Sequence, residues 1–158
     1  MNIVTYSPQD VLLTMGGAYV TGWNTISITR DSNAFRKIAG IRGKHTRTRT
    51  YDSSATITLG IPQSSEWNDI LSNIVTNDIS SGSQRIEVQL KDASGSSLFS
   101  SIEAYVIGYP DVTYDIGVNT RTWTIQCLST STYNVGGNSK PTTKLLDSAV
   151  SGIKGLFS

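Results

Sequence analysis

The spacing of apolar residues predicts a chain built mainly from short β-strands. Residues 10–15 alternate, with Val11, Leu13 and Met15 on one face, and Gly16-Gly17 is typical of a tight hairpin turn into residues 18–20. Successive side chains of a strand point to opposite faces, so each such segment buries one face and exposes the other. The other segments with a strand pattern are residues 23–30, 55–61, 84–91, 97–107, 111–114 and 120–128.

One long helix is predicted for residues 64–77, where Ser64 or Ser65 suits the capping position. Its apolar residues recur at the spacing that forms a single stripe along a helix. These residues are Trp67, Ile70, Leu71, Ile74 and Val75. About eight strands joined by short turns, with one helix, indicate a mainly β fold: an antiparallel β-sandwich or barrel with one flanking α-helix.

The stretch from residue 26 to residue 59 does not fit a simple core pattern. Residues 31–43 are expected to form a loop, in which residues 34–39 suit a helical turn. The strand that follows, residues 44–51, is polar on both faces, with Lys44, Thr46, Thr48 and Thr50 on one side and His45, Arg47, Arg49 and Tyr51 on the other. Such a strand cannot cover an ordinary core, so a water-filled lumen, a neighbouring subunit or a ligand must account for it.

The chain of 158 residues is long enough for one domain with its own core. We expect that β domain to span residues 1–128. Residues 129–158 are expected to be a flexible linker and a C-terminal tail, because Ser, Thr, Gly and Asn dominate residues 129–139. Apolar residues then recur at helical spacing between Leu145 and Phe157, which predicts a weak amphipathic helix that needs a partner.

Charge and hydropathy narrow the choice of partners. The chain has 13 basic and 12 acidic residues, a net charge of +1, and only 16% charged residues, which gives no overall attraction to nucleic acid or to anionic membranes. A poorly charged surface rich in Ser, Thr and Asn favours association into a larger assembly. No apolar run approaches the length that spans a bilayer, and the N-terminal residues lack a signal pattern, so no membrane partner is expected.

Catalytic and metal-binding chemistry finds little support. His45 is the only histidine and has basic neighbours, and no His/Cys cluster accompanies it. Cys127 is the only cysteine, and it shares the apolar face of its strand with Trp123 and Ile125, which is typical of a small buried residue. We therefore expect no enzyme activity, no catalytic residue, no metal and no cofactor.

Six basic residues lie close together, and two interpretations of them remain open. They are Arg36, Lys37, Arg42, Lys44, Arg47 and Arg49. A basic stripe can bind nucleic-acid phosphates, yet only Phe35 and Tyr51 are nearby to stack on bases. Arginine is also preferred in ion pairs between subunits. We favour the subunit interface, with acidic partners on a neighbouring copy such as Asp31, Asp52 or Glu103.

Short pieces of the sequence, in their order along the chain, resemble the tail tube proteins of long-tailed, contractile-tailed bacteriophages. The pieces are YSPQDV (6–11), ITRDSNAFRK (28–37), Gly40, TRTR (46–49), ATITL (55–59), NDIL (68–71), KDASG (91–95) and TRTWTI (120–125). The resemblance covers residues 7–128. It implies a β-sandwich or barrel flanked by a helix, a fold that the family shares with the tubes of type VI secretion systems.

The resemblance also implies a function in assembly. Six copies would form a ring, stacked rings would form a hollow tube, and part of each sheet would join its neighbours to line the lumen. The inter-subunit loop would reach an adjacent subunit or ring and would contain Phe35, Arg36, Lys37, Ile38 and Arg42. The lumen or interface strand would contain Thr46, Arg47, Thr48, Arg49 and Thr50. Further partners would be the tail sheath, the tape-measure protein and baseplate or terminator proteins. DNA would pass without specific binding, in a virion tail assembled in the host cytoplasm.

One departure from the family concerns charge. Lumens in this family tend to be acidic, whereas the most polar strand here is basic. Either Arg47 and Arg49 pair at interfaces, and Thr46, Thr48 and Thr50 line the lumen with acidic residues from elsewhere, or this tube has an unusual lining. We favour the first. The alternatives are a stand-alone β-barrel module that binds a ligand or nucleic acid, and a tube protein of the type VI secretion kind.

Overall fold

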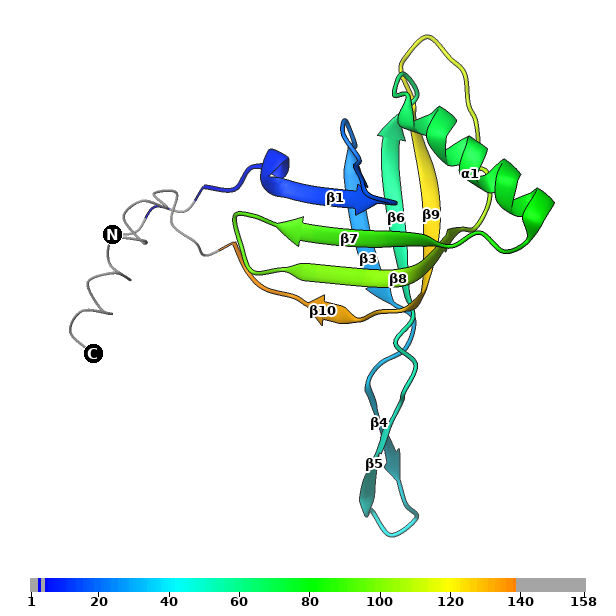
Figure 1. Cartoon of the computed structure of the whole chain (residues 1–158). Helices are drawn as coiled ribbons and strands as arrows, with labels where there is room; N and C mark the ends of the chain where they lie inside the picture. Colours follow the sequence, from blue (N-terminus) through cyan, green and yellow to red (C-terminus); the bar gives the residue numbers. More distant parts are fainter. Residues whose placement is uncertain (1–2, 4, 139–158) are drawn as a thin grey trace.

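The computed structural model describes residues 3 and 5–138 of the chain. In this part of the chain the structure is mainly β, with one α-helix, and all strand pairs are antiparallel (Figure 1). The elements are η1 (Pro8–Asp10), β1 (Val11–Met15), β2 (Ala18–Tyr19), β3 (Thr25–Arg30), β4 (Phe35–Ala39), β5 (His45–Arg49), β6 (Ala55–Pro62), α1 (Trp67–Ser81), β7 (Ile86–Asp92), β8 (Leu98–Val106), β9 (Thr120–Ser129) and β10 (Thr132–Asn134).

The main sheet folds back on itself to make two layers. Its strands follow the order β2-β1-β7-β8-β9-β6-β3, and β10 pairs with β8. The first half of β8 pairs with β10 and its second half pairs with β9, with a register shift between Glu103 and Ala104. In Figure 1 the strands β1, β7, β8 and β10 cross β3, β6 and β9 at a steep angle. The prediction of an antiparallel β-sandwich with one flanking helix is therefore confirmed.

The core lies between these two layers and contains the apolar residues that the alternation predicts. Strand β6 contributes Ile57, Leu59 and Ile61, and β9 contributes Trp123, Ile125 and Cys127, all of them buried. Buried residues of the other layer are Leu13, Met15, Val88, Phe99 and Val106. Cys127 is thus a buried packing residue, as its strand pattern predicts.

Helix α1 covers the core with a narrower stripe than the sequence predicts. Trp67, Leu71 and Val75 are buried and Ile74 is partly buried, but Ile70 is 40% exposed. The helix begins at Trp67 rather than at residue 64, because residues 63–66 form a turn in which the Ser65 hydroxyl accepts a hydrogen bond from the Trp67 amide at 3.2 Å.

A buried asparagine joins the start of α1 to the sheet. Asn68 Nδ2 donates to the backbone oxygens of Pro62 (2.9 Å) and Ser65 (3.1 Å). Its Oδ1 accepts a hydrogen bond of 3.0 Å from Trp123 Nε1 on β9. Local spacing does not mark Asn68 as buried, because asparagine is polar and the residue that follows it, Asp69, is also polar.

Three local predictions are wrong. Residues 34–39 do not form a helical turn: Phe35–Ala39 is strand β4, paired with β5. Residues 111–114 form no strand and belong to the loop 107–119 between β8 and β9. Residues 129–138 are not a flexible linker, because Thr132–Asn134 extends the sheet as β10. The predicted amphipathic helix between residues 145 and 157 lies outside the described residues.

Candidate functional site

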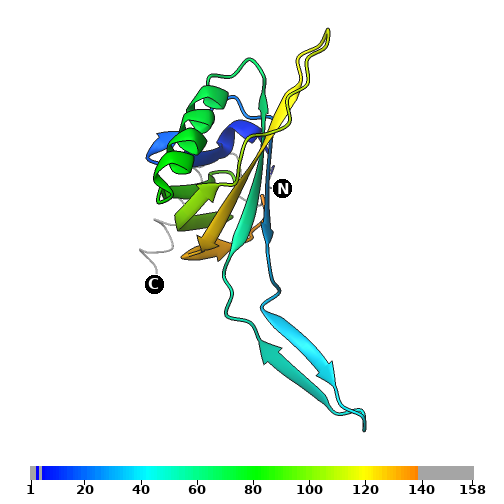
Figure 2. The ribbon, with the colours of Figure 1, turned by 90° about the vertical axis from the view of Figure 1, so that its right-hand side faces the viewer.

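The β4–β5 hairpin projects from the body as a separate arm, defined here as residues 32–51. It continues the β3–β6 ribbon away from the core, as both views show (Figures 1 and 2). Gly43, at φ +81°, closes the hairpin with the help of a hydrogen bond from the Gly40 amide to the Lys44 oxygen. Every strand residue of the arm is exposed, so the arm contributes nothing to the core. An isolated two-stranded hairpin is marginally stable in water, which indicates that another surface covers it.

The structure brings the predicted loop residues and strand residues together on this arm. One face contains Phe35, Lys37, Ala39, His45, Arg47 and Arg49, and the other contains Arg36, Ile38, Thr46 and Thr48. Arg47 stacks on the Phe35 ring at 4.2 Å and Arg49 on the Tyr51 ring at 5.0 Å. Thr50 hydrogen-bonds through its amide to the Ala34 oxygen at the base of the arm, and Arg42 lies in the turn at its tip.

The charge of the arm works against its own stability. Lys37 lies directly opposite Arg47, and like charges in this position are destabilising. The arm holds six of the chain's 13 basic residues and none of its 12 acidic residues. An external source of negative charge would therefore stabilise it.

Two of the acidic residues suggested as partners for the arm are used within the subunit. Asp31, at one root of the arm, accepts hydrogen bonds from Thr56 Oγ1 (2.7 Å) and Gln126 Nε2 (2.6 Å). These hydrogen bonds lower the pKa of the Asp31 carboxyl below its usual value. Asp52, at the other root, accepts hydrogen bonds from the Ser54 amide and the Ser32 hydroxyl, and the Ser54 bonds lower its pKa. Both residues fix the base of the arm on the sheet.

A broad surface of mostly hydroxyl side chains covers the outer side of the β3–β6–β9 layer, and we call it the hydroxyl face. The Asp31 carboxylate borders it, where it accepts hydrogen bonds from Thr56 and Gln126. Cross-strand pairs place its side chains in rows opposite the buried apolar residues. Its members are Thr25, Ser27, Thr29, Thr56, Thr58, Thr120, Thr122, Thr124 and Gln126. This face is not among the sequence predictions, although threonine alternates with apolar residues in both 55–61 and 120–127. Strand β3 ends the sheet among the described residues, so its outer edge offers backbone groups to a further strand.

The end of the molecule opposite the arm is acidic. It consists of residues 62–84, which contain α1, and the loop 107–119, and both segments lie at the top of Figures 1 and 2. These two segments hold Glu66, Asp69, Asp78, Asp111 and Asp115 and no basic residue. One cation reaches them from β9, because Arg121 donates a hydrogen bond of 3.1 Å to the Tyr114 hydroxyl. The loop also exposes large apolar side chains, namely Ile107, Tyr109, Val112, Tyr114, Ile116 and Val118.

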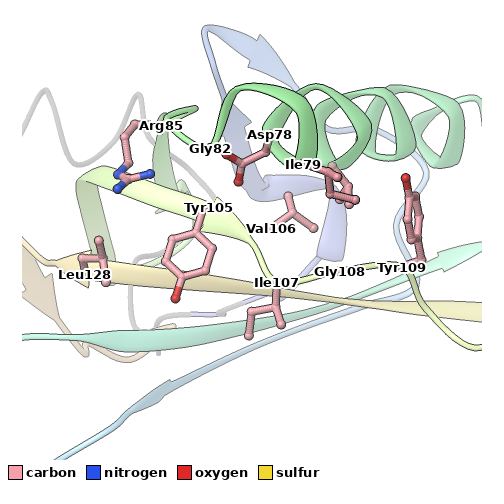
Figure 3. A pocket seen from close by; sticks show the side chains of 11 residues that line it. Asp78, Ile79, Gly82, Arg85, Tyr105, Val106, Ile107, Gly108, Tyr109 and Leu128 are labelled. Carbon is pink, nitrogen blue, oxygen red and sulfur yellow. The ribbon is translucent and has the colours of Figure 1, made fainter.

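A groove of about 570 Å³ lies between the C-terminal part of α1 and the ends of β8 and β9 (Figure 3). Ile79, Tyr105, Ile107 and Tyr109 form much of its wall. Its charged side chains are engaged locally, because Asp78 accepts a hydrogen bond from the Gln84 amide and Arg85 donates to the Gln84 oxygen. The groove thus has an apolar wall and charged side chains that are hydrogen-bonded within the subunit.

Two general findings concern the described residues. No group of three or more His, Cys, Asp or Glu side chains is placed there to hold a metal ion. None of the helices in that part of the chain has the length and hydropathy needed to cross a membrane.

Burial raises the pKa of the Cys127 thiol to about 11.

Sequence comparison identifies a phage relative. No protein-family model matches the chain. The chain is 32% identical over 147 residues to "Structural protein ORF10" of Pseudomonas phage KPP10, a match that covers 86% of this chain and 84% of the relative.

Solved structures with the same fold come from an extracellular contractile injection system, the anti-feeding prophage and the tail of a GTA particle. A sheath/tube terminator of the PVC extracellular contractile injection system matches with a TM-score of 0.53 and 14% identity over 84% of this chain and 96% of that one. The tube-terminating cap of the anti-feeding prophage matches with a TM-score of 0.51 and 11% identity over 84% and 95% of the two chains. The tail of an empty GTA particle with C6 symmetry matches with a TM-score of 0.57 and 10% identity over 83% and 100%. At these identities the likeness establishes the fold.

Proposed function

The chain belongs to the same family as the phage structural protein ORF10, and we propose that it is the subunit from which a phage tail tube is built. The observation that carries this proposal is the hydroxyl face, a wide surface of neutral side chains without a cation on the outer side of the β3–β6–β9 layer. A protein that forms a conduit needs such a surface toward its lumen and separate surfaces toward its neighbours. The name of the relative also supports a structural role rather than an enzymatic one.

The hydroxyl face suits the lining of a tube through which DNA passes. Its threonine, serine and glutamine side chains are short and carry no charge, so they offer no cation that would hold phosphates. We therefore assign the lumen to this face rather than to Thr46, Thr48 and Thr50. Those three residues belong to the arm, which is paired separately from the main sheet and has basic residues on both faces.

Six copies would form each ring, with the outer edge of β3 continued by a strand of the next copy. A free sheet edge favours this type of contact, because a further strand satisfies its backbone groups. The arm would contact a neighbouring copy, where Arg47 and Arg49 pair with acidic groups. A tape-measure protein and DNA would occupy the lumen, while the sheath and the baseplate or terminator proteins would contact the outside and the ends. The protein would thus be part of the virion tail, with assembly in the host cytoplasm.

A tube terminator is the second candidate, because two of the similar structures are terminators. A terminator stops the stack and needs one stacking surface. The present chain offers exposed contact surfaces at both ends, the arm and the acidic end, which favours a subunit that repeats along the tube.

Negative-stain electron microscopy of the purified full-length protein at high concentration tests this proposal. Hollow tubes of stacked rings are expected, whereas single rings would indicate a terminator. A protein that stays monomeric at high concentration and is absent from virions would refute both assignments.

Cysteine labelling tests which face lines the lumen. A large maleimide reagent should modify Thr58→Cys, on the hydroxyl face, in the monomer but not in assembled tubes. Glu87→Cys, on the exposed side of β7, is the matched control and should react in both states. Equal protection of the two positions, or protection of Glu87→Cys alone, would contradict the assignment.

A further inference from the structure

The two ends of the molecule have opposite charge. The arm holds six of the 13 basic residues and no acidic residue, whereas the acidic end holds five of the 12 acidic residues and no basic one. The overall charge of +1 conceals this separation. Figures 1 and 2 place the arm and the acidic end on opposite sides of the sandwich, so one subunit cannot bring its own two charged ends together.

The arm has the properties of an incomplete structure. It has no buried residue in either strand, its like charges Lys37 and Arg47 lie directly opposite each other, and Phe35, Ile38 and Ile41 expose apolar surface. A partner with carboxylates and apolar side chains would offset all three disadvantages. A bare phosphate backbone would supply the charge but would leave the apolar side chains uncovered.

The loop 107–119 at the other end has the matching properties. Ile116 is fully exposed, and Val112, Tyr114 and Val118 are at least half exposed beside Asp111 and Asp115.

Hydrogen bonds hold both roots of this loop in place. Gln63 and Asn119 exchange two hydrogen bonds near the start of α1. At the other root, the hydroxyls of Thr76 and Tyr109 lie 2.7 Å apart. The apolar tip between these roots is therefore presented on a fixed base, ready to receive a partner.

We propose that the arm of one copy docks on the acidic end of the next copy, with its cations facing Asp111 and Asp115 and with Ile38 and Ile41 against the apolar tip of the loop. The proposal rests on the proposed tube function, and it names the acceptor of the arm. Two different surfaces meet in such a contact, so it is heterologous and repeats without limit along one direction. This geometry gives a polar stack in which every interior subunit has both its arm and its acidic end covered.

A charge exchange in the full-length chain tests this contact. Arg47→Glu with Arg49→Glu, and separately Asp111→Lys with Asp115→Lys, should each abolish tubes, because each variant places side chains of like charge opposite each other at the proposed contact. An equimolar mixture of the two variants, or one chain with all four substitutions, should restore tubes. Arg85→Glu with Lys91→Glu is the matched control for the arm variant, since it makes the same change in net charge outside both ends, and it should assemble normally.

Disulfide trapping tests the contact in solution, including below the concentration at which tubes form. Native Cys127 is buried, so it does not interfere. Mild oxidation of the variant with Ile41→Cys and Ile116→Cys should give a ladder of oligomers, because each copy contributes both ends. Ile41→Cys with Ile102→Cys, an exposed position on β8, should stay monomeric. Dimers from Ile41→Cys alone would indicate a contact between two arms and would refute the proposal.

The outcomes separate this inference from the function on which it rests. Wild-type tubes without restoration by the charge exchange, and without a disulfide ladder, would refute the docking and leave the tube function intact. A disulfide ladder from a protein that never forms tubes would support the docking and refute the tube function. Reversal of Arg47 and Arg49 that abolishes binding to a duplex DNA and leaves tubes unchanged would make the arm a nucleic-acid site and would also overturn the proposal.

Discussion

Replacement of Asn68 by alanine should destabilise the protein more than its place on a surface-lying helix suggests. The substitution removes the acceptor of the Trp123 indole N–H, which is 3.0 Å away on a side chain that is only 1% exposed. A buried donor left without a partner costs about 1–3 kcal/mol. The two donated hydrogen bonds add roughly 0.5 kcal/mol each, at the low end of the usual range, because the oxygens of Pro62 and Ser65 also accept backbone amides.

The total expected loss is about 2–4 kcal/mol in the free energy of unfolding, measured by urea denaturation. For a chain of this size it corresponds to a fall in Tm of roughly 6–12 °C. Asn73→Ala, on the exposed side of the same helix, is the control and should cost less than about 0.5 kcal/mol.

A double-mutant cycle isolates the indole contact. Trp123→Phe removes the donor while it keeps most of the apolar surface, so Asn68→Ala should then cost about 1–2 kcal/mol less than in the wild type. An equal cost in both backgrounds, or a loss below about 1 kcal/mol in the wild type, would show that the hydrogen bond does not hold α1 on β9.

Four further outcomes are expected. Trp67→Ala should lower the free energy of unfolding by about 3–5 kcal/mol, because the indole is buried under α1, and a loss below about 1 kcal/mol would contradict this packing. Arg47→Glu alone should reduce tube formation in a sedimentation assay while the thermal unfolding curve stays unchanged; unaltered tubes would count against its interface role. The carboxyl of Asp52 has a lowered pKa, so its stabilisation of the arm base is present above the usual pKa of 3.8 and is lost as the pH falls through the lower pKa of the folded state. Protection of the Ser54 amide from hydrogen exchange should therefore drop in that pH range, because this amide donates to Asp52. Constant protection would argue against the bond. The pKa of Cys127 is raised to about 11, so its contribution to the free energy of unfolding is complete below the unfolded pKa of 9.0 and is lost as the pH rises through about 11. A thiol reagent that modifies the folded protein rapidly at pH 8 would contradict the burial of this residue.

The alternation of residues along the chain was sufficient to predict most of the body. The period of two in residues 55–61 and 120–128 marks β6 and β9, and the period of 3.6 from Trp67 to Val75 marks α1, because burial of one face depends only on local spacing. The same local reasoning failed for residues 34–39. Their composition permits a helical turn, and only pairing with His45–Arg49 across the Gly40–Gly43 turn makes them a strand.

The sequence by itself determined that the chain is mainly β, that it has one helix, and that residues 44–51 have no core of their own to cover. The tertiary structure alone decided that this polar segment is half of a projecting arm, and that α1 and the loop 107–119 form an acidic end on the opposite side. It also decided that three strands distant in sequence combine their threonines into one hydroxyl face. The physical reason is that a side chain's face follows from local periodicity, whereas its neighbours across strands and its place on the surface follow from long-range pairing, which local spacing does not encode.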